Sequence, residues 1–427
     1  MAEVAVPAKA SAGNASPAGL ILFMMALHVV NQIDRQLVAA FAADIMRDLQ
    51  LNRSQFALIA GLAFSGVYAF AALAAGVMAD RIGRVRVLAS GLGAWSLFTA
   101  LSGLAHGFWS LLGVRPFVAA GEATLVPTAS NIILARVDER HRAGALGLFF
   151  AGIPIGIGGG FLIAGLLGPA IGWRWTFIGM GLVGLVALLG LSRIRDKAPE
   201  LVERPTLLGN LGAVFTLWRQ VPRIMWASLA IIFAHAHSAT SPFVQLWLTA
   251  EKGYDQASAG AVYGGTFVIA GLAGTFGSGL LVDWAARRLG WDRAKTVLLV
   301  LLALAPLLVC YRLAPGGSPL FMAGMVGSIL FMTVLYGPIF AVIEELLPPR
   351  LKATATGLNM LLINIFAIGG VSFAIGFASD RMALAGAAHS WTLPLIGADL
   401  AACLAIPCTY LAMRCRPVRA AGSALDR

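Results

Sequence analysis

Apolar runs long enough to cross a bilayer follow one another along almost the whole of this 427-residue chain. A membrane-spanning helix needs about 20 mostly apolar residues. Only 12% of the residues are charged, which is roughly half the fraction found in soluble domains. These properties exclude a soluble globular protein and predict an all-α integral membrane protein.

Short polar stretches divide the chain into twelve apolar runs, which predict twelve transmembrane helices. Their approximate bounds are Leu20–Phe41, Gln55–Met78, Val87–Ala105, Phe108–Ala135, Ala143–Ile171, Trp175–Leu191, Ile224–Thr249, Ala257–Val282, Thr296–Tyr311, Pro319–Leu347, Ala353–Phe377 and Trp391–Met413. We therefore expect an N-terminal tail (1–19), a six-helix bundle (20–191), a linker (192–223), a second six-helix bundle (224–413) and a C-terminal tail (414–427). The linker stretch TLLGNLGAVFTLWRQ predicts a short helix lying on the membrane surface.

The basic residues predict the orientation of the chain. If the N-terminus is cytoplasmic, 23 of the 31 Lys and Arg fall in cytoplasmic segments, six fall outside and two, Arg35 and Arg115, lie within spans. The positive-inside rule then favours cytoplasmic tails at both ends, and we expect the inner (plasma) membrane of a bacterium. Basic residues spread over short loops do not make a nucleic-acid surface. In this count Arg312 lies in an outer loop, so the second bundle carries no Lys or Arg inside a span.

The two bundles repeat each other. The pattern G-x3-D-x3-R occurs at Gly76, Asp80 and Arg84, and again 203 residues later, where Asp283 and Arg287 complete it. RAGALGL and KATATGL lie 210 residues apart. These offsets predict two halves in the same orientation, related by pseudo-two-fold symmetry, with a substrate site between them near the middle of the bilayer.

The stretch GVMADRIGRVR resembles the signature loop of the major facilitator superfamily (MFS), G-x-x-x-D-R-x-G-R-x-R. The resemblance implies the MFS fold and a secondary transporter that works by alternating access. Its cytoplasmic gate would contain Gly76, Asp80, Arg81 and Arg84 in the first half, with Asp283 and Arg287 as counterparts in the second.

Four charged residues lie inside spans of the first half. Asp34 and Arg35 are adjacent in the first helix, and Arg115 and Glu122 lie seven residues apart on one face of the fourth. A charge at the bilayer centre costs about 2.5–3.5 kcal/mol on insertion scales, so it persists where it faces a cavity or a partner. Two carboxylates beside two guanidinium groups predict proton coupling, because loss or gain of a proton changes which cation is neutralised. The alternative is a static salt bridge that only fixes helix packing.

The same residues resemble the Spinster-like lipid transporters of the MFS, through N-x-x-D-R in the first helix and R-x6-G-E-A in the fourth. LNRSQFALIAGLAFSGVYAF, GAWSLFTALSGLA and LPPRLKATATGLNMLLINIFAIGG extend the resemblance over about residues 20–410. It implies transport of a lysophospholipid or sphingoid-type lipid, with Asp34 and Glu122 in proton coupling and Arg35 and Arg115 at the head group. Gln32 departs from the aromatic residue that is frequent at its position.

Other polar residues within spans are candidates for the substrate cavity: Asn31, Tyr263, Tyr336, Asn364 and His237. His235 also lies in the seventh span, and Asp399 in the twelfth, where it serves either helix packing or function. Glycines at four-residue spacing, Gly152, Gly156 and Gly160, let helices approach closely. Together with Gly260 and Gly264 they are expected to line sliding surfaces between the halves.

Three substrate classes stay open on the sequence. Besides a lipid, a small organic anion such as a sugar acid would suit the same N-x-x-D-R and G-E motifs, and a multidrug exporter would share the cavity chemistry. The apolar second half argues against the sugar acid. The chain shows no nucleophile–base set, metal site or nucleotide loop, so we expect no enzyme and no cofactor. We expect a monomer whose partners are substrate, protons and membrane lipids, and no nucleic acid.

Overall fold

A computed structural model describes residues 16–194 and 207–415, except for the side chains of several helical positions, Asp80 and Tyr336 among them. The described part is helical and contains no strand. Nine of its helical stretches are long and apolar enough to span a membrane. One of them, Glu139–Leu191, turns back at Gly172 and supplies two spans. The interrupted helix Pro222–Glu251 and the helix Pro319–Leu346 complete the twelve, so the predicted fold class is confirmed.

Several spans are built from more than one helical segment. The first half contains α1 (Pro17–Ala40), α2 (Ala42–Asp48), α3 (Arg53–Ala57), η1 (Leu58–Leu62), α4 (Ala63–Ile82), α5 (Arg84–Ser102), α6 (Phe108–Glu122), α7 (Leu125–Leu134), η2 (Glu139–His141), α8 (Arg142–Phe150) and α9 (Gly152–Leu191). The predicted linker helix is α10 (Leu207–Gln220). The second half contains α11 (Pro222–Ala234), η3 (His235–Thr240), α12 (Ser241–Glu251), α13 (Gln256–Leu289), α14 (Arg293–Leu313), α15 (Pro319–Leu346), α16 (Pro349–Leu362), η4 (Ile363–Gly370), α17 (Val371–Leu384), α18 (Thr392–Cys403) and α19 (Ala405–Arg414).

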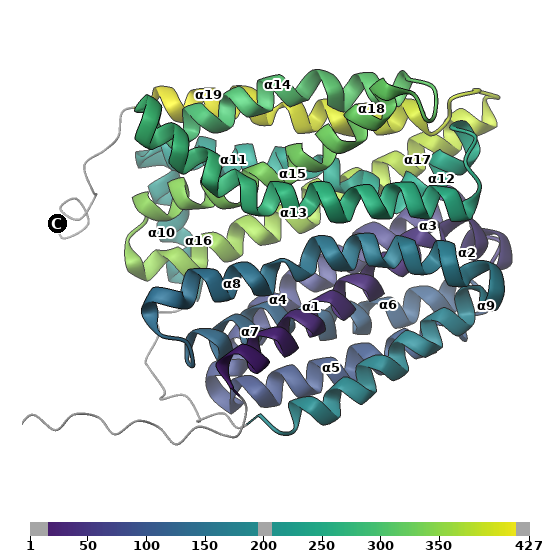
Figure 1. The fold of residues 1–427 in the computed structure, drawn as a ribbon, viewed down its shortest axis with the longest axis horizontal. Helices are drawn as coiled ribbons and strands as arrows, with labels where there is room; N and C mark the ends of the chain where they lie inside the picture. The colour runs from purple at the N-terminus through teal and green to yellow at the C-terminus, as the bar shows by residue number, and fades with distance from the viewer. Residues whose placement is uncertain (1–15, 195–206, 416–427) are drawn as a thin grey trace, which may run out of the picture.

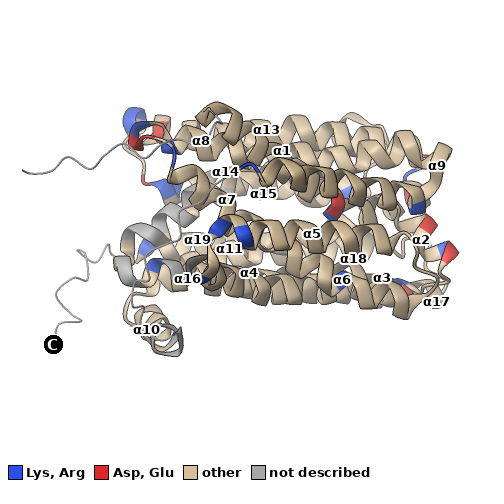
Figure 2. Ribbon diagram, turned by 90° about the horizontal axis from the view of Figure 1, so that it is seen from below, with Lys and Arg blue, Asp and Glu red and all other residues tan. Residues whose placement is uncertain are grey.

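The two halves lie side by side with their helices roughly parallel to one axis (Figure 1). We call the end where α4 passes into α5 and where α10 lies the basic end, and the opposite end, where α2 and α12 lie, the far end. Lys and Arg gather at the basic end (Figure 2). Helix α10 packs there against α11 and α16, with Val214 and Leu217 buried.

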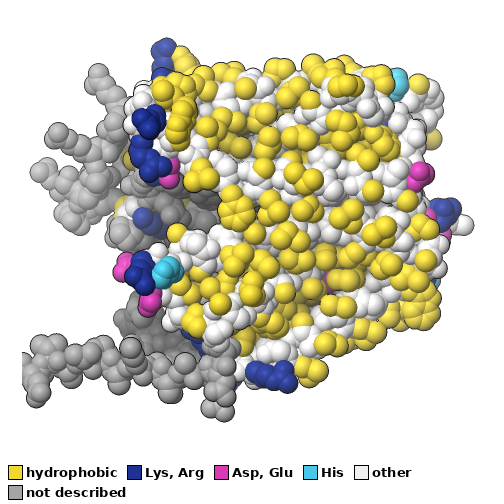
Figure 3. Space-filling model, in the orientation of Figure 1, with side chains coloured by type: hydrophobic (Ala, Val, Ile, Leu, Met, Phe, Trp, Pro, Cys, Tyr) yellow, Lys and Arg dark blue, Asp and Glu magenta, His cyan; other side chains and the backbone are white. Residues whose placement is uncertain are grey.

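On the face shown in Figure 3, hydrophobic side chains cover most of the surface between the two ends, and Lys and Arg gather toward its edges. Large apolar side chains such as Phe70, Trp109 and Leu166 are exposed there. In water such a surface would drive aggregation, whereas in a bilayer it faces acyl chains. This apolar surface therefore marks the part of the molecule that lies within the membrane.

The signature loop at the basic end depends on a glycine in the left-handed region. Gly83 has φ 100°, ends α4 and precedes α5. Arg84 donates from Nη1 to the carbonyl of Asn131 at 3.3 Å, which ties the loop to the end of α7. Arg81 is exposed, and no atom lies within 4 Å of the position that a Cβ on Gly76 would take. The side chain of Asp80 lies outside the described residues.

In the second half the equivalent gate residues make one local contact. Arg287 donates from Nε to the carbonyl of Asp283 at 3.3 Å, one helical turn earlier, and both side chains are exposed. This hydrogen bond lies within α13, so it does not join the two halves.

Glycines bring α9 and α13 into backbone contact across the halves. A Cβ on Gly264 would lie 2.6 Å from the carbonyl oxygen of Gly158, and one on Gly260 would lie 2.6 Å from that of Phe161. The expectation for Gly152, Gly156 and Gly160 was wrong. These three face α1 of their own half, where Cβ atoms would meet His28, Gln32 and Gln36. A four-residue spacing keeps them on one face of α9, while Gly158 lies on the other.

Several hydrogen bonds between described residues join the two halves at the far end. Asp380 of α17 accepts from the backbone N–H of Arg53 (3.0 Å) and of Ser54 (2.8 Å), and from the Ser54 hydroxyl (2.5 Å). The Arg53 guanidinium donates to Ser379 Oγ (2.5 Å) and to Ser390 Oγ (2.9 Å). We call these five residues the far-end latch. Asp380 thus supplies the N-terminal amides of α3 with an acceptor from the other half.

Candidate functional site

The first charged residue predicted to lie within a span is fully enclosed. Asp34 is 1% exposed and Asn31, one turn earlier on α1, is 2% exposed. Both carboxylate oxygens of Asp34 and the amide nitrogen of Asn31 are buried without a hydrogen bond of normal geometry, and the Trp95 side chain is the polar neighbour of Asp34. An ionised carboxylate is unstable in such surroundings unless a proton or a nearby cation neutralises it.

The second carboxylate lies at a break in the fourth span. Glu122 is 0% exposed and is the last residue of α6, which is followed by Ala123 and Thr124 before α7 begins. Arg115 lies two turns earlier on the same helix and is 2% exposed. The break follows Gly121, where a Cβ would lie 2.7 Å from the backbone nitrogen of Trp95 on α5. The close approach of α5 and α6 thus fixes the position of Glu122.

The two arginines share an aromatic neighbour. The guanidinium carbon of Arg35 lies 4.9 Å from the centre of the Phe64 ring, and that of Arg115 lies 4.5 Å from the same centre. Arg35 also lies 4.6 Å from the Tyr68 ring and is only partly buried. Stacking on aromatic faces stabilises both cations, and a stacked guanidinium group still presents N–H donors at its edge.

The four charges lie within electrostatic reach of one another. Glu122 interacts electrostatically with Arg35 and Arg115, and Asp34 interacts electrostatically with Glu122 and Arg115. Neither oxygen of Glu122 has a hydrogen-bond partner, and Arg115 Nε also lacks one. The arrangement is therefore not a closed salt bridge among described residues. It is a set of buried charges whose balance changes when one proton is added or removed.

His28 on the same helix is a further buried polar residue that was not predicted from the sequence. His28 is 0% exposed, its Nδ1 lies 3.1 Å from the carbonyl of Phe149, and its ring stacks on Phe149 at 4.5 Å. Gln32 Nε2 lies 3.5 Å from His28 Nε2. The sequence contained a pattern that could have indicated this pair, because His28 and Gln32 are four residues apart and fall on one helical face.

The predicted second-half residues lie apart from this cluster. Tyr263 is 8% exposed and packs edge-to-face on Phe161 of the first half at 4.7 Å, so it belongs to the contact between the halves. Asn364 lies in the π-helical segment η4 and donates to the Met360 carbonyl at 2.9 Å. The side chain of Tyr336 lies outside the described residues.

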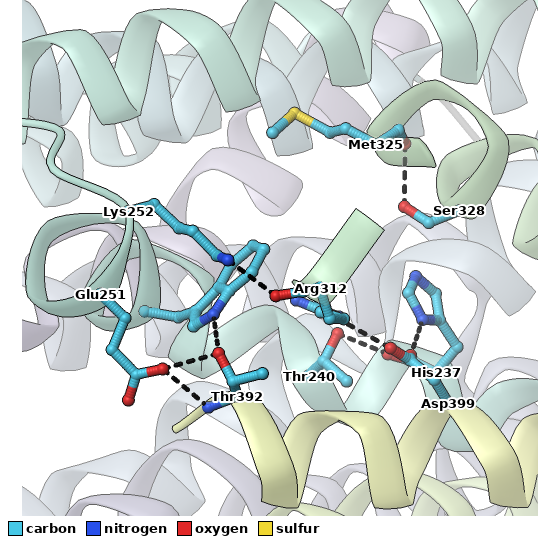
Figure 4. A network of polar contacts seen from close by, with 10 residues as sticks. His237, Thr240, Glu251, Lys252, Arg312, Met325, Ser328, Thr392 and Asp399 are labelled. Atoms are coloured by element: carbon cyan, nitrogen blue, oxygen red, sulfur yellow. Dashed lines mark hydrogen bonds and ion pairs between the residues drawn. The ribbon is translucent and has the colours of Figure 1, made fainter. Parts of the chain in front are cut away.

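One expectation about the second half was wrong, because Arg312 is not in an outer loop. It lies inside α14, which extends to Leu313, and is 0% exposed. Its Nε donates to Asp399 Oδ2 at 2.8 Å, while His237 Nδ1 lies 2.6 Å from Asp399 Oδ1 (Figure 4). We call Arg312, Asp399 and His237 the second-half triad. It joins α14, α18 and η3.

Aromatic rings and a lysine hold Arg312 in the bundle. Its guanidinium carbon lies 4.6 Å from the Trp247 ring and 4.7 Å from the Tyr311 ring. Lys252 donates from Nζ to the carbonyls of Arg312 (2.7 Å) and Ala314 (2.8 Å), which satisfies the end of α14. Nη1 and Nη2 of Arg312 are buried without a hydrogen-bond partner.

Comparison with known proteins identifies the family. The family model of the Major Facilitator Superfamily matches residues 24–371. The chain belongs to the Major Facilitator Superfamily. Members of this family are transporters rather than enzymes. Among the described residues, no group of three or more His, Cys, Asp or Glu is placed to hold a metal ion.

Relatives of this MFS chain differ in their named substrates. An MFS-type efflux pump of Mycolicibacterium smegmatis is 28% identical over 83% of this chain and 82% of its own length. A probable L-galactonate transporter of Escherichia coli is 28% identical over 63% and 61%. A probable sphingolipid transporter, spinster homolog 2 of Arabidopsis thaliana, is 22% identical over 86% and 81%.

A solved structure is similar over nearly the whole fold. It is a bacterial homologue of the human lysosomal transporter Spinster, in an inward-facing and occupied conformation. The TM-score is 0.79 at 21% identity, covering 94% of this chain and 98% of that one. At this identity the likeness is one of fold.

Proposed function

We propose that this MFS chain is a proton-coupled secondary active transporter that works by alternating access. The observation that carries the proposal is the pair of fully buried carboxylates, Asp34 and Glu122, whose oxygens lack hydrogen-bond partners beside the buried Arg115. A proton bound by this pair frees a guanidinium group for an anionic substrate, and release of the proton lets the pair neutralise it again. One copy of the chain contains both halves, so a monomer suffices.

The distribution of Lys and Arg supports the orientation. The sequence puts 23 of the 31 in segments expected to be cytoplasmic, and the described loops among these segments lie at the basic end (Figure 2), so this end faces the cytoplasm together with both termini. The far-end latch then closes the outer side. In this conformation substrate exchanges with the cytoplasmic side, and release of the latch opens the other.

We favour an amphipathic lipid, lysophospholipid or sphingoid in type, as the substrate. Arg35 and Arg115 would contact its head group, stacked on Phe64 and with N–H groups available. The resemblance of the helix 1 and helix 4 motifs to Spinster-like transporters supports this class. So does the similarity to a probable sphingolipid transporter.

A sugar acid is the second candidate, and the second-half triad favours it. A second half without buried cations would disfavour a small polar anion, but Arg312 is a buried cation in that half. The similarity to a probable L-galactonate transporter points the same way. A multidrug exporter, in line with the efflux-pump relative, would use the same charged cluster with a broader substrate range.

Substrate-evoked proton flux tests the proposal. Purified protein would be placed in sealed liposomes that contain a pH-sensitive dye, and a lysophospholipid, a sphingoid base and a sugar acid would be added separately. The double variant Asp34→Asn/Glu122→Gln serves as the blank, and Glu139→Gln, a change of an exposed acidic residue outside the cluster, serves as the matched control.

Each outcome is informative. Proton movement with one of the lipids alone, absent in the blank and retained in Glu139→Gln, supports the lipid transporter. Proton movement with the sugar acid alone supports an organic-anion transporter in which Arg35 and Arg115 bind the carboxylate of the substrate. Transport that is equal in wild type and blank contradicts proton coupling through these carboxylates.

A further inference from the structure

The repeat between the halves places a titratable residue opposite Asp34. The gate residues Asp80 and Asp283 are 203 positions apart, and so are Asn52 and Asp255, which cap the second and eighth spans. The same offset carries Asp34 onto His237. The second half thus has an imidazole at the level where the first half has a buried carboxylate.

The second-half triad gives His237 a fixed partner. Asp399 receives Arg312 on one oxygen and faces His237 Nδ1 with the other. The side chains of Asp399 and Arg312 are 0% exposed, whereas that of His237 is 10% exposed. Arg312 and Asp399 together are neutral, so the imidazole is the member of the triad that can accept and release a proton. Its Nε2 points away from Asp399 (Figure 4).

The elements packed against η3 bring no competing charge to this level among described residues. His235 of the same segment bonds through Nδ1 to the Ile231 carbonyl of its own helix. Asn364 of η4 is uncharged and bonds within its helix. The remaining ionisable groups lie at the ends of their helices: Glu251 bonds to Thr392, Lys252 to carbonyls at the end of α14, Asp380 belongs to the far-end latch, Arg381 is exposed, and Arg223 pairs with Asp292.

His237 also lies beside a contact between the halves. It sits in the 3-10 segment η3, where the seventh span changes from α11 to α12. Ser241, four residues later, donates to Gln36 Oε1 at 3.1 Å. Gln36 is two residues after Asp34, so His237 and Asp34 flank the same inter-half hydrogen bond from opposite sides. A proton taken up at either residue is placed to change that contact.

We infer that His237 is a second proton-binding site of the transport cycle, held by Asp399, whose charge Arg312 balances. The site lies in the half that the carboxylate pair does not reach. The inference deepens the proposed function and rests on it for its role in transport, while the binding of a proton to His237 stands on its own.

Nuclear magnetic resonance of protein labelled at its six histidines tests the proton site directly. The His237 signal is assigned by its absence in His237→Gln. We expect the imidazole to change protonation as the pH is varied, and the transition to move in Asp399→Asn because the carboxylate partner is lost. A His237 signal that is constant with pH overturns the inference. So does a transition that Asp399→Asn leaves in place.

Proton counting in liposomes tests the role in transport. With whichever substrate evokes flux in wild type, His237→Gln should lower the number of protons per substrate by about half, because one of two sites is removed. Substrate exchange without a proton gradient should persist. His235→Gln, in the same turn, is the matched control and should keep the wild-type ratio. An unchanged ratio in His237→Gln overturns the role. Wild-type transport without protons overturns the proposed function instead, and the resonance experiment still decides whether His237 binds a proton.

Discussion

Arg312 is buried because Asp399 neutralises it, and this pairing predicts the effect of separating the two. In Arg312→Met the carboxylate of Asp399 loses its cation while it stays 0% exposed. Breaking a buried ion pair by removing one partner costs about 3–5 kcal/mol. We therefore expect a clearly lower melting temperature in detergent, and a large recovery in Arg312→Met/Asp399→Leu, where no buried charge is left over.

An exposed arginine provides the control for this pair of variants. Arg381→Met removes a guanidinium group that lies over the Phe377 ring at the surface, so the melting temperature should hardly change. Equal melting temperatures for the single Arg312 variant and the double variant would show that the ion pair does not stabilise the second half.

Charged residues were predictable when they interrupted an apolar run. Asp34, Arg115 and Glu122 stand in the middle of such runs, so their burial followed from the sequence. Arg312 stands one residue beyond the expected end of its run, where hydropathy alone cannot separate a loop from the last turn of a helix. Its partner Asp399 is 87 residues away. Only the packing of α14 against α18 brings them together, and no local pattern encodes that contact.

At the scale of helices, the contact between α9 and α13 predicts a strong difference between adjacent glycines. A Cβ on Gly264 would lie 2.6 Å from the Gly158 carbonyl oxygen, whereas nothing lies within 4 Å of one on Gly265. Overpacking of this kind costs about 1–3 kcal/mol. Gly264→Ala should therefore melt at a lower temperature, while Gly265→Ala should match or exceed wild type because alanine favours the helix. Equal shifts in the two variants would contradict the close approach.

The loop between the first two spans predicts a pH dependence. The Trp173 indole N–H, at 2.9 Å, is the main reason that the pKa of Asp48 lies below its usual value, and Arg174 adds to the effect. A lowered pKa means that the ionised form is favoured in the folded state. The stabilisation is fully present above the unfolded pKa and is lost as the pH falls through the folded one.

Asp48→Asn should therefore lower the melting temperature at neutral pH and have little effect in acid. Melting temperatures of wild type and variant would be compared across the acidic range in detergent. A gap between the two proteins that stays constant with pH would show that the Asp48 charge does not contribute.

The twelve spans could be predicted from the sequence, but their interruptions could not. The segment η3 and the break after Glu122 lie within apolar runs, whereas the turn at Gly172 falls between two of the predicted spans. Hydropathy reports burial in lipid and is insensitive to such local changes in backbone. The prediction for the α9 glycines was wrong for a related reason. Their spacing defines one face of the helix, but it does not show which neighbouring helix packs against that face.

For the whole molecule, the far-end latch predicts how the outer side opens. Asp380→Ala removes three hydrogen bonds between the halves, each contributing about 0.5–1.5 kcal/mol, so the open population should rise more than about tenfold. Spin labels at the exposed positions Gln50 and Ala388, in a variant without the four native cysteines, would measure the distance across the far end. We expect a longer distance to become populated.

The neighbouring substitution Arg381→Ala is the control, because Arg381 lies over a ring of its own helix rather than across the halves. It should leave the distance distribution as in wild type. The same distribution in Asp380→Ala and wild type would mean that packing of the glycines, rather than the latch, holds the far end closed.

The latch also links transport to the activity of water. When Asp380 leaves α3, two backbone amides, a hydroxyl and a carboxylate exchange their partners for hydration shells. Solutes that are excluded from protein surfaces, such as sucrose, oppose any step that creates new hydrated surface. Osmotic stress on the outer side would then hold the transporter closed there, and the turnover rate would depend on the solution outside the cell as well as on the gradients of substrate and proton.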